Sequence, residues 1–239
     1  MKARPAFASR SRGGTASCGF GYKTAWFALR GADVDAVATA LRLSTVRPMP
    51  AAQAIAAAYE SNGAFITPPL KGWTLVMSVD FLYLADGPSP DFVSTLTRLS
   101  AELHCEAQFF ASHRVVECHA WASAVDGEMR RAYCYEGSSG EKRVDIGEPT
   151  PQEEALQHRF FDPCSPDAGT DEYWERGEQQ GLRFADEKDV MDVAGLWSVD
   201  PSIDGAIPDG FLADFDARPV KTRAIPQPSR PAKPWWRIW

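Results

Sequence analysis

An Asp-Gly pair, Asp126-Gly127, lies between two runs of small and aromatic residues and limits the possible folds more than any other feature of the chain. The stretch around it, residues 117–137, is ECHAWASAVDGEMRRAYCYEG. A two-residue type I′ turn needs positive φ at both central positions, which Asp-Gly adopts readily. The stretch therefore predicts an antiparallel hairpin over residues 115–136.

Regular pairing outward from this turn sets Val125 opposite Glu128 and, further along, His119 opposite Cys134. The His119–Cys134 contact is the one arrangement in the hairpin with reactive potential, because a neighbouring imidazolium lowers the pKa of a thiol. The same pair also serves as ordinary packing between strands. We therefore keep His119 and Cys134 as candidates for thiol chemistry and assign no catalytic residue. If the contact is absent, the hairpin is scaffold.

Hydrophobic periodicity along the rest of the chain predicts an alternation of strands and helices. Apolar or alternating runs predict strands at 23–29, 64–69, 73–84, 106–112, 113–125, 128–137 and 142–148. Helical spacing, capping residues and first-turn prolines predict helices at 31–43, 48–63, 90–104, 149–157 and 185–197, and 162–185 is expected to be an acidic loop. This order indicates an α+β fold in which amphipathic helices flank an antiparallel or mixed sheet.

Composition divides the chain into three parts. Residues 1–20 are basic and rich in Ser, Gly and Ala, without the apolar region of an export signal, and we expect a disordered leader. Residues 21–210 are expected to form a single α+β domain. Residues 211–239 are rich in proline and tryptophan and basic, so we expect a C-terminal arm in which no regular helix or central strand runs far.

Cysteine usage favours a cytoplasmic protein with reduced thiols. The five cysteines form an odd set without CxxC spacing, in a chain long enough to build its own core. No apolar run approaches the roughly 18 residues of a membrane span. The adjacent pairs His104-Cys105 and Cys118-His119 diverge on a strand, so only one member of each could easily bind zinc. With His113 nearby zinc stays conceivable, but we assign no metal site and no cofactor.

The net charge of −7 conceals a strongly acidic middle. The first 30 and the last 23 residues each carry six basic residues and no acid, so residues 31–216 have a net charge of −19. Such a surface repels nucleic acid and attracts a cationic protein partner, although solubility alone also explains it. Within the acidic segment we expect Asp171, Glu172 and Glu175 to contact the partner.

Two segments carry a resemblance to a group of known proteins. They are WASAVDGEMRRAYCYEGSSGEKRVDIGEPTPQEEAL at 121–156 and DEKDVMDVAGLWSVDPS at 186–202. The pattern, over roughly residues 20–205, resembles uncharacterised bacterial proteins that are similar to immunity proteins of polymorphic or secreted toxins. The resemblance implies a protein that neutralises a toxin by binding it. It includes no catalytic motif and transfers no site residue.

Two other functions stay open at this point. The first is an enzyme whose site is assembled from dispersed residues, for which the candidates are His119, Cys134, Glu117 and Asp126; a fold that packs them away from any cleft removes this alternative. The second is a peripheral interaction protein that docks on a membrane surface or on another protein.

The peripheral alternative depends on the end of the C-terminal arm. That end is PKPWWRIW, and tryptophan and arginine are common anchors at interfaces. We therefore expect Trp235 and Trp236 to take part in partner binding. Our leading expectation is a non-catalytic acidic binding protein of immunity type.

Overall fold

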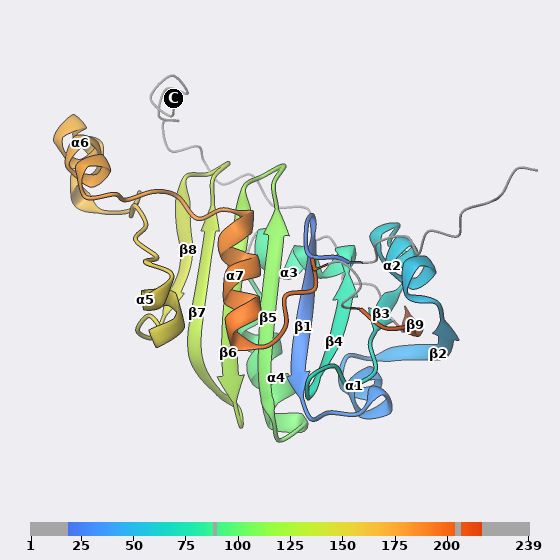
Figure 1. Ribbon diagram of the computed structural model, residues 1–239. Coiled ribbons are helices and arrows are strands. Elements are labelled where there is room, and N and C mark those ends of the chain that lie inside the picture. The colour runs from blue at the N-terminus through green and yellow to red at the C-terminus, as the bar shows by residue number, and fades with distance from the viewer. Residues whose placement is uncertain (1–18, 88–89, 204–206, 217–239) are drawn as a thin grey trace, which may run out of the picture.

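The computed structural model describes residues 19–87, 90–203 and 207–216. They form an α+β fold built on one nine-stranded sheet with the strand order β2-β9-β3-β4-β1-β5-β6-β7-β8, as Figure 1 shows. Every pair of neighbouring strands is antiparallel, which confirms the expected class. Most of the expected leader, and Trp235 and Trp236, lie outside the described residues.

The strands are β1 Thr24–Arg30, β2 Leu43–Met49, β3 Ala64–Ile66, β4 Trp73–Ser78, β5 Glu106–His113, β6 Cys118–Val125, β7 Glu128–Glu136, β8 Glu141–Ile146 and β9 Gly210–Phe215. The helices are α1 Val34–Ala40, α2 Ala51–Tyr59, α3 Tyr83–Asp86, α4 Phe92–Glu102, α5 Pro151–Ala155, α6 Asp171–Gln179 and α7 Glu187–Trp197, with 3₁₀ turns η1 Val79–Leu82 and η2 Pro166–Gly169. Among the described residues, no helix is both long and apolar enough to cross a membrane.

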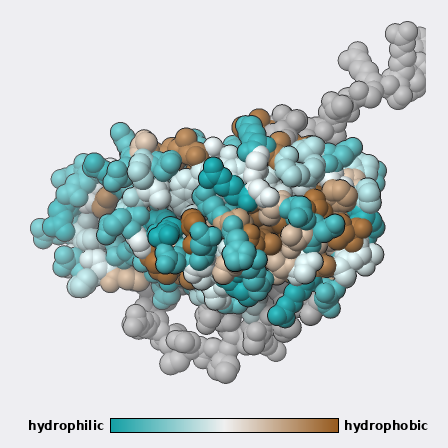
Figure 2. All heavy atoms as spheres, turned by 90° about the horizontal axis from the view of Figure 1, so that it is seen from below, coloured by the Kyte–Doolittle hydropathy of each residue, from teal (hydrophilic) through white to brown (hydrophobic). Residues whose placement is uncertain are grey.

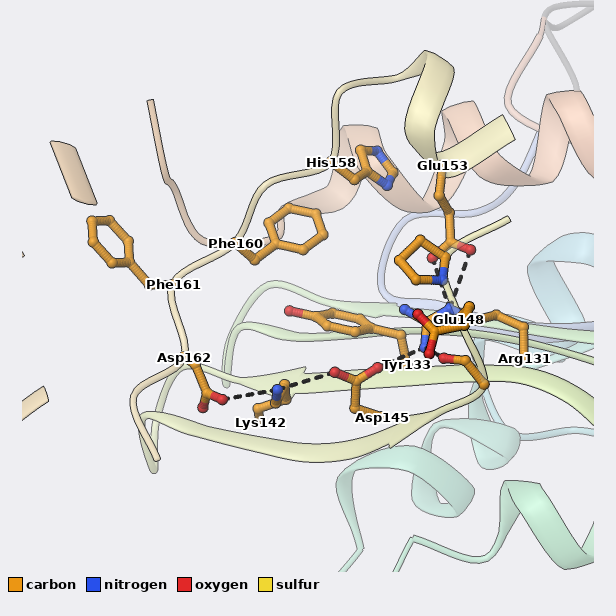
Figure 3. Close-up of a pocket in the computed structure, with 12 residues that line it drawn as sticks. Arg131, Tyr133, Lys142, Asp145, Glu148, Glu153, His158, Phe160, Phe161 and Asp162 are labelled. Atoms are coloured by element: carbon orange, nitrogen blue, oxygen red, sulfur yellow. Dashed lines mark hydrogen bonds and ion pairs between the residues drawn. The ribbon is translucent and has the colours of Figure 1, made fainter. Parts of the chain in front are cut away.

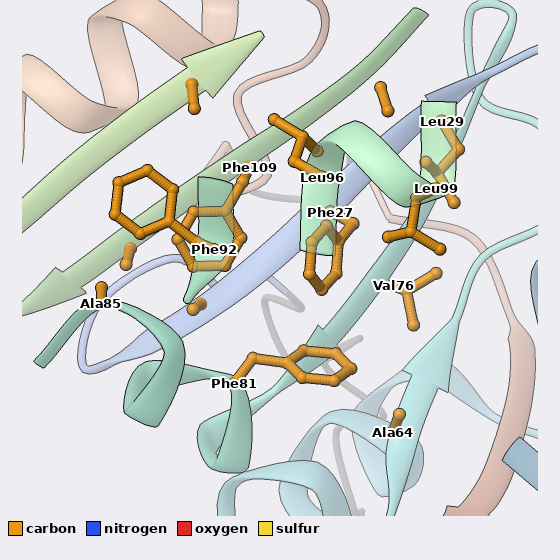
Figure 4. Packing of buried hydrophobic residues seen from close by; sticks show 14 of the residues in the cluster. Phe27, Leu29, Ala64, Val76, Phe81, Ala85, Phe92, Leu96, Leu99 and Phe109 are labelled. Atoms are coloured by element: carbon orange, nitrogen blue, oxygen red, sulfur yellow. The ribbon is translucent and has the colours of Figure 1, made fainter. Parts of the chain in front are cut away.

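Helices cover both faces of the sheet. Helices α3 and α4 lie behind it and α7 lies in front, as Figure 1 shows. On the α4 face, Phe92 stacks on Phe109 with ring centroids 5.2 Å apart, beside Leu96 and Leu99 of α4 (Figure 4). Because successive strand residues point to opposite faces, neighbouring Phe110 lies in the second core under α7. The central strands are therefore apolar on both sides.

The turn of the predicted hairpin is confirmed, but most of its register is wrong. Asp126 and Gly127 have φ of 49° and 83°, as a type I′ turn requires. Val125 pairs with Glu128 as expected, but a β-bulge then shifts the pairing by one residue. His119 consequently lies opposite Tyr135, and Cys134 lies opposite Ala120.

Two further segments differ from the sequence expectation. The predicted strand at 73–84 ends at Ser78, because the Ser78 side chain accepts a hydrogen bond from the Asp80 backbone N–H and starts η1. The segment 162–185, expected to be a loop, contains α6, which Thr170 caps by accepting from the Tyr173 N–H.

Two strands were not expected from the sequence at all. Strand β2 lies at one edge of the sheet, and β9 lies between β2 and β3. Because β9 spans Gly210–Phe215, the sheet extends past residue 210, where the sequence placed the end of the domain.

Candidate functional site

The structure separates the two candidates for thiol chemistry. Cys134 lies in the core on the α4 face, where its Sγ is 4.0 Å from Sγ of Cys118. The hydrogen bond with Cys134, together with burial, raises the pKa of the Cys118 thiol well above its ordinary value. His119 is buried and pairs with Tyr135, which belongs to the core of the opposite face. The expected His119–Cys134 contact does not exist, so no imidazole lies beside the Cys134 thiol.

The other two candidates for an enzyme site, Glu117 and Asp126, do not lie close together. Glu117 precedes β6 and Asp126 follows it, and both are exposed. A strand of this length sets its ends about 25–30 Å apart. The described residues also contain no group of three or more His, Cys, Asp or Glu placed to hold a metal ion.

A polar pocket of about 470 Å³ lies at the β8 edge of the sheet (Figure 3). Four elements contribute to it, namely β7, β8, the turn 147–149 with α5, and the segment 158–162 that follows α5. Its lining residues are Arg131, Tyr133, Lys142, Asp145, Gly147, Glu148, Pro149, Glu153, His158, Phe160, Phe161 and Asp162. The pocket thus brings together charged and aromatic side chains that all come from one stretch of the chain, residues 131–162.

A buried ion pair forms the inner wall of the pocket. Arg131 Nε donates to Glu153 Oε1 at 3.0 Å, and the two side chains are only 5% and 2% exposed. Trp121 Nε1 donates to the same oxygen at 2.8 Å, while the Thr150 backbone N–H donates to Oε2. Because Thr150 and Glu153 form the capping box of α5, this short helix is anchored to the sheet through a charged residue.

A second set of charges forms the outer wall. Lys142 Nζ lies 3.0 Å from Asp145 and 2.9 Å from Asp162. Burial opposes the charge of Lys142, but the two carboxylates outweigh it and raise the lysine pKa. Likewise, burial raises the pKa of Asp145, while hydrogen bonds from Arg131 and Lys142 lower it below its ordinary value. Both groups are therefore charged at neutral pH.

A cluster of aromatic rings completes the pocket. The ring centroid of Tyr133 lies 4.5 Å from that of Trp121 and 5.3 Å from that of Phe160, and the Trp121 and Phe160 rings also contact each other. The Tyr133 hydroxyl points between the outer wall and the phenylalanines in Figure 3, and it has no hydrogen-bond partner among the described residues. Burial raises the pKa of this phenol far above 10, so the hydroxyl stays neutral and can both donate and accept.

His158 closes the back of the pocket. Its Nε2 lies 3.0 Å from Oδ1 of buried Asp189, while Nδ1 has no hydrogen-bond partner in the described part of the chain. Although burial raises the pKa of Asp189, hydrogen bonds from Arg183 and His158 bring it well below its usual range. The Arg183 guanidinium also lies 5.2 Å from the centroid of the Phe160 ring. This network ties the pocket to the start of α7.

The three acidic residues expected to bind a partner lie on α6, next to the pocket. Asp171, Glu172 and Glu175 are all exposed. The opposite side of the helix packs on Phe161, which contacts Gly177 so closely that an added Cβ would lie 2.2 Å from its ring. Phe161 also lines the pocket, so the acidic helix and the pocket belong to one surface.

No family model, no curated protein and no solved structure matches this chain.

Sequence reasoning did not single out the residues of the pocket. One signal was available, because Arg131 falls within a strand predicted to be packed, and a buried guanidinium requires a carboxylate partner. The partner, Glu153, was visible only as an acid near the start of a helix. Nothing in the sequence shows that α5 folds over Arg131 of β7.

Proposed function

We propose that this protein is a non-catalytic binding protein that captures a cationic protein partner, in the manner of an immunity protein that neutralises a basic toxin domain. The observation that carries the proposal is the acidic surface at the β8 end of the sheet. Residues 148–192, which hold α5, α6 and the start of α7, contain 13 acidic and four basic residues. Glu153 and Asp189 are buried, and the other 11 acidic residues are exposed or partly exposed. An acidic surface accelerates encounter with a basic protein and disfavours acidic competitors.

The position of α6 supports this role. In Figure 1 it lies beyond β8, clear of both faces of the sheet. Asp171, Glu175 and Glu178 are spaced at i, i+4 and i+7, so they share one side of the helix, turned away from Gly177. A partner can therefore reach these carboxylates without displacing the core.

Aromatic residues beneath α6 give such an interface an apolar component. Tyr173 and Trp174 are half-buried against Phe161, and Phe184 is 37% exposed. Aromatic side chains next to charged ones are the usual composition of binding hot spots. The face shown in Figure 2 is different, since its hydrophobic residues are scattered in small patches among hydrophilic ones.

The cytoplasm is the compartment we propose for it. Cys118 and Cys134 are 4.0 Å apart at their sulfurs and both are reduced, as is exposed Cys164. Thiols of this kind persist in a reducing compartment.

The test uses the proteins encoded by the genes next to the gene for this chain, among which we expect a basic partner. We expect the partner and this protein to bind each other, with an association rate that falls as salt is added, and co-expression to relieve any growth arrest that the partner causes. The double variant Glu175→Lys/Glu178→Lys should weaken binding about tenfold or more, because both lysines repel a cationic surface.

The matched control is Asp35→Lys/Glu60→Lys, which makes the same change of charge on α1 and after α2, at the other end of the sheet. It should change the affinity by less than about threefold, since screening limits exposed charges to roughly 10 Å. Absence of binding, or equal weakening by both double variants, would contradict the proposal. Binding without relief of toxicity would contradict its immunity component.

A further inference from the structure

We propose that the pocket between β7, β8 and α5 receives the guanidinium group of an arginine side chain from the cationic partner. This inference rests on the proposed function and identifies the group that the partner inserts. The pocket, at about 470 Å³, falls within the size range of pockets that hold small organic groups.

The charge of the lining selects a cation. Four carboxylates line the pocket, at Asp145, Glu148, Glu153 and Asp162, against the two permanent cations Arg131 and Lys142. The two cations are already engaged by three of the carboxylates. Glu148 is exposed at the rim and has no ion-pair partner among the described residues. An entering anion would meet a net negative lining, whereas a cation would be attracted to it.

The unpartnered polar atoms of the pocket suit a donor-rich group. Tyr133 is 3% exposed, and its buried hydroxyl lacks a partner among the described residues. Nδ1 of His158 is also buried without a hydrogen-bond partner among the described residues. A buried polar atom without a hydrogen bond is destabilising, and a ligand that bonds to it recovers that loss. A guanidinium has five N–H donors, so a single group can donate to a hydroxyl and to a carboxylate of the lining at the same time.

The aromatic lining favours guanidinium over ammonium. Phe160 and Phe161 flank the space in front of the Tyr133 hydroxyl, as Figure 3 shows. Planar guanidinium groups stack on aromatic rings and are less strongly hydrated than ammonium groups. The protein already uses this contact, because Arg183 lies over the Phe160 ring at 5.2 Å and Arg131 over the Tyr133 ring at 5.7 Å.

Three probes test the inference by calorimetric titration of the full chain. They are the peptide acetyl-Gly-Arg-Gly-amide, its citrulline counterpart, which is neutral and similar in shape, and free L-arginine. We expect the arginine peptide to bind at least tenfold more tightly than the citrulline peptide. Equal affinity for both peptides, or no binding of either, would overturn the inference. If free arginine binds more tightly than the peptide, the guanidinium that the pocket receives does not come from a protein partner.

Two variants locate the binding. Tyr133→Phe removes the hydroxyl and keeps the ring, and we expect it to weaken binding of the arginine peptide at least fivefold. Its control is Tyr135→Phe, which lies on the same strand and face but outside the pocket lining. Glu148→Gln should also weaken binding of the arginine peptide at least threefold. Because Glu148 is exposed, this substitution should not disturb folding. Wild-type affinity in both Tyr133→Phe and Glu148→Gln would overturn the inference.

The outcomes also separate this inference from the proposed function. If the basic partner binds and depends on α6, but the arginine peptide does not bind, the pocket inference alone fails. If the peptide binds as expected and no basic partner does, the proposed function alone fails.

Discussion

Two consecutive arginines show how the position of a side chain decides what its charge does. Arg131 is buried and its Nε and Nη1 hydrogen-bond to Glu153, Asp145 and backbone carbonyls. Arg130 is 58% exposed and pairs with Glu128, which is 70% exposed. A buried charge that loses its partner is far more costly than an exposed one, because water cannot replace the partner.

We therefore predict that Arg131→Ala lowers the free energy of unfolding by about 3–5 kcal/mol, because it leaves Glu153 buried and unpaired. Arg130→Ala, the matched control, should lower it by no more than about 1 kcal/mol. Urea denaturation followed by tryptophan fluorescence measures both. Similar losses in the two variants would mean that Glu153 finds another partner or water.

His119 gives the folded state a dependence on pH. Burial lowers its pKa from 6.5 to about 4, although Asp186 and Asp189 act in the opposite direction. Between these two pH values the unfolded chain binds a proton at His119 that the folded chain does not. Stability from this residue is therefore complete above about pH 6.5 and is lost as the pH falls toward 4.

We predict that this loss amounts to about 3 kcal/mol between pH 6.5 and pH 4. His119→Gln cannot titrate, so its free energy of unfolding should change less steeply with pH than that of the wild type, whatever its stability at neutral pH. Urea denaturation at several pH values measures the two slopes. Parallel slopes would show that His119 takes up a proton in the folded protein at the same pH as in the unfolded chain.

In the hairpin, the Asp126-Gly127 turn was predicted correctly, but one β-bulge changes which residues face each other beyond it. Regular pairing from the turn would place Arg131 opposite Ala122, on the face covered by α4, where the surrounding core is apolar. The bulge moves Arg131 to the opposite face, opposite Ser123, and puts Ala132 opposite Ala122 in its place. Burying an unpaired guanidinium costs more than one irregular ladder position, so the irregular register is the more stable one.

Helix α6 shows why some helices cannot be predicted from their own residues alone. Its capping residue and acidic first turn are local signals that were present in the sequence. Its apolar side consists of Tyr173, Trp174 and Gly177, which share one face but include only two large apolar side chains. Phe161 and Phe184, which cover that side, come from outside the helix.

At the level of the whole molecule, the sheet depends on a strand from the far end of the chain. Strand β9 pairs with both β2 and β3, and its Leu212 and Ala213 are buried. Without β9, the edge strand β2 has no neighbour in the sheet, and the buried edge of β3 loses its hydrogen bonds.

We predict that a chain ending at Asp209 loses cooperative unfolding or unfolds at a much lower urea concentration. A chain ending at Asp216, the control, keeps all nine described strands and should unfold cooperatively. Circular dichroism during urea denaturation distinguishes the two. Equal midpoints for both truncated chains would show that β9 contributes little to the fold.

Short-range interactions account for what could be predicted. The Asp126-Gly127 turn, the apolar stripe of α4 and the cap of α5 are each specified by residues a few positions apart, so the α+β class and most elements follow from the sequence. The β2–β9 pairing, the bulge and the pocket join residues whose contacts exist only after both faces of the sheet are packed. The Arg131–Glu153 pair is the clearest case, because its two charges are stable in the interior only when β7 and α5 have already come together.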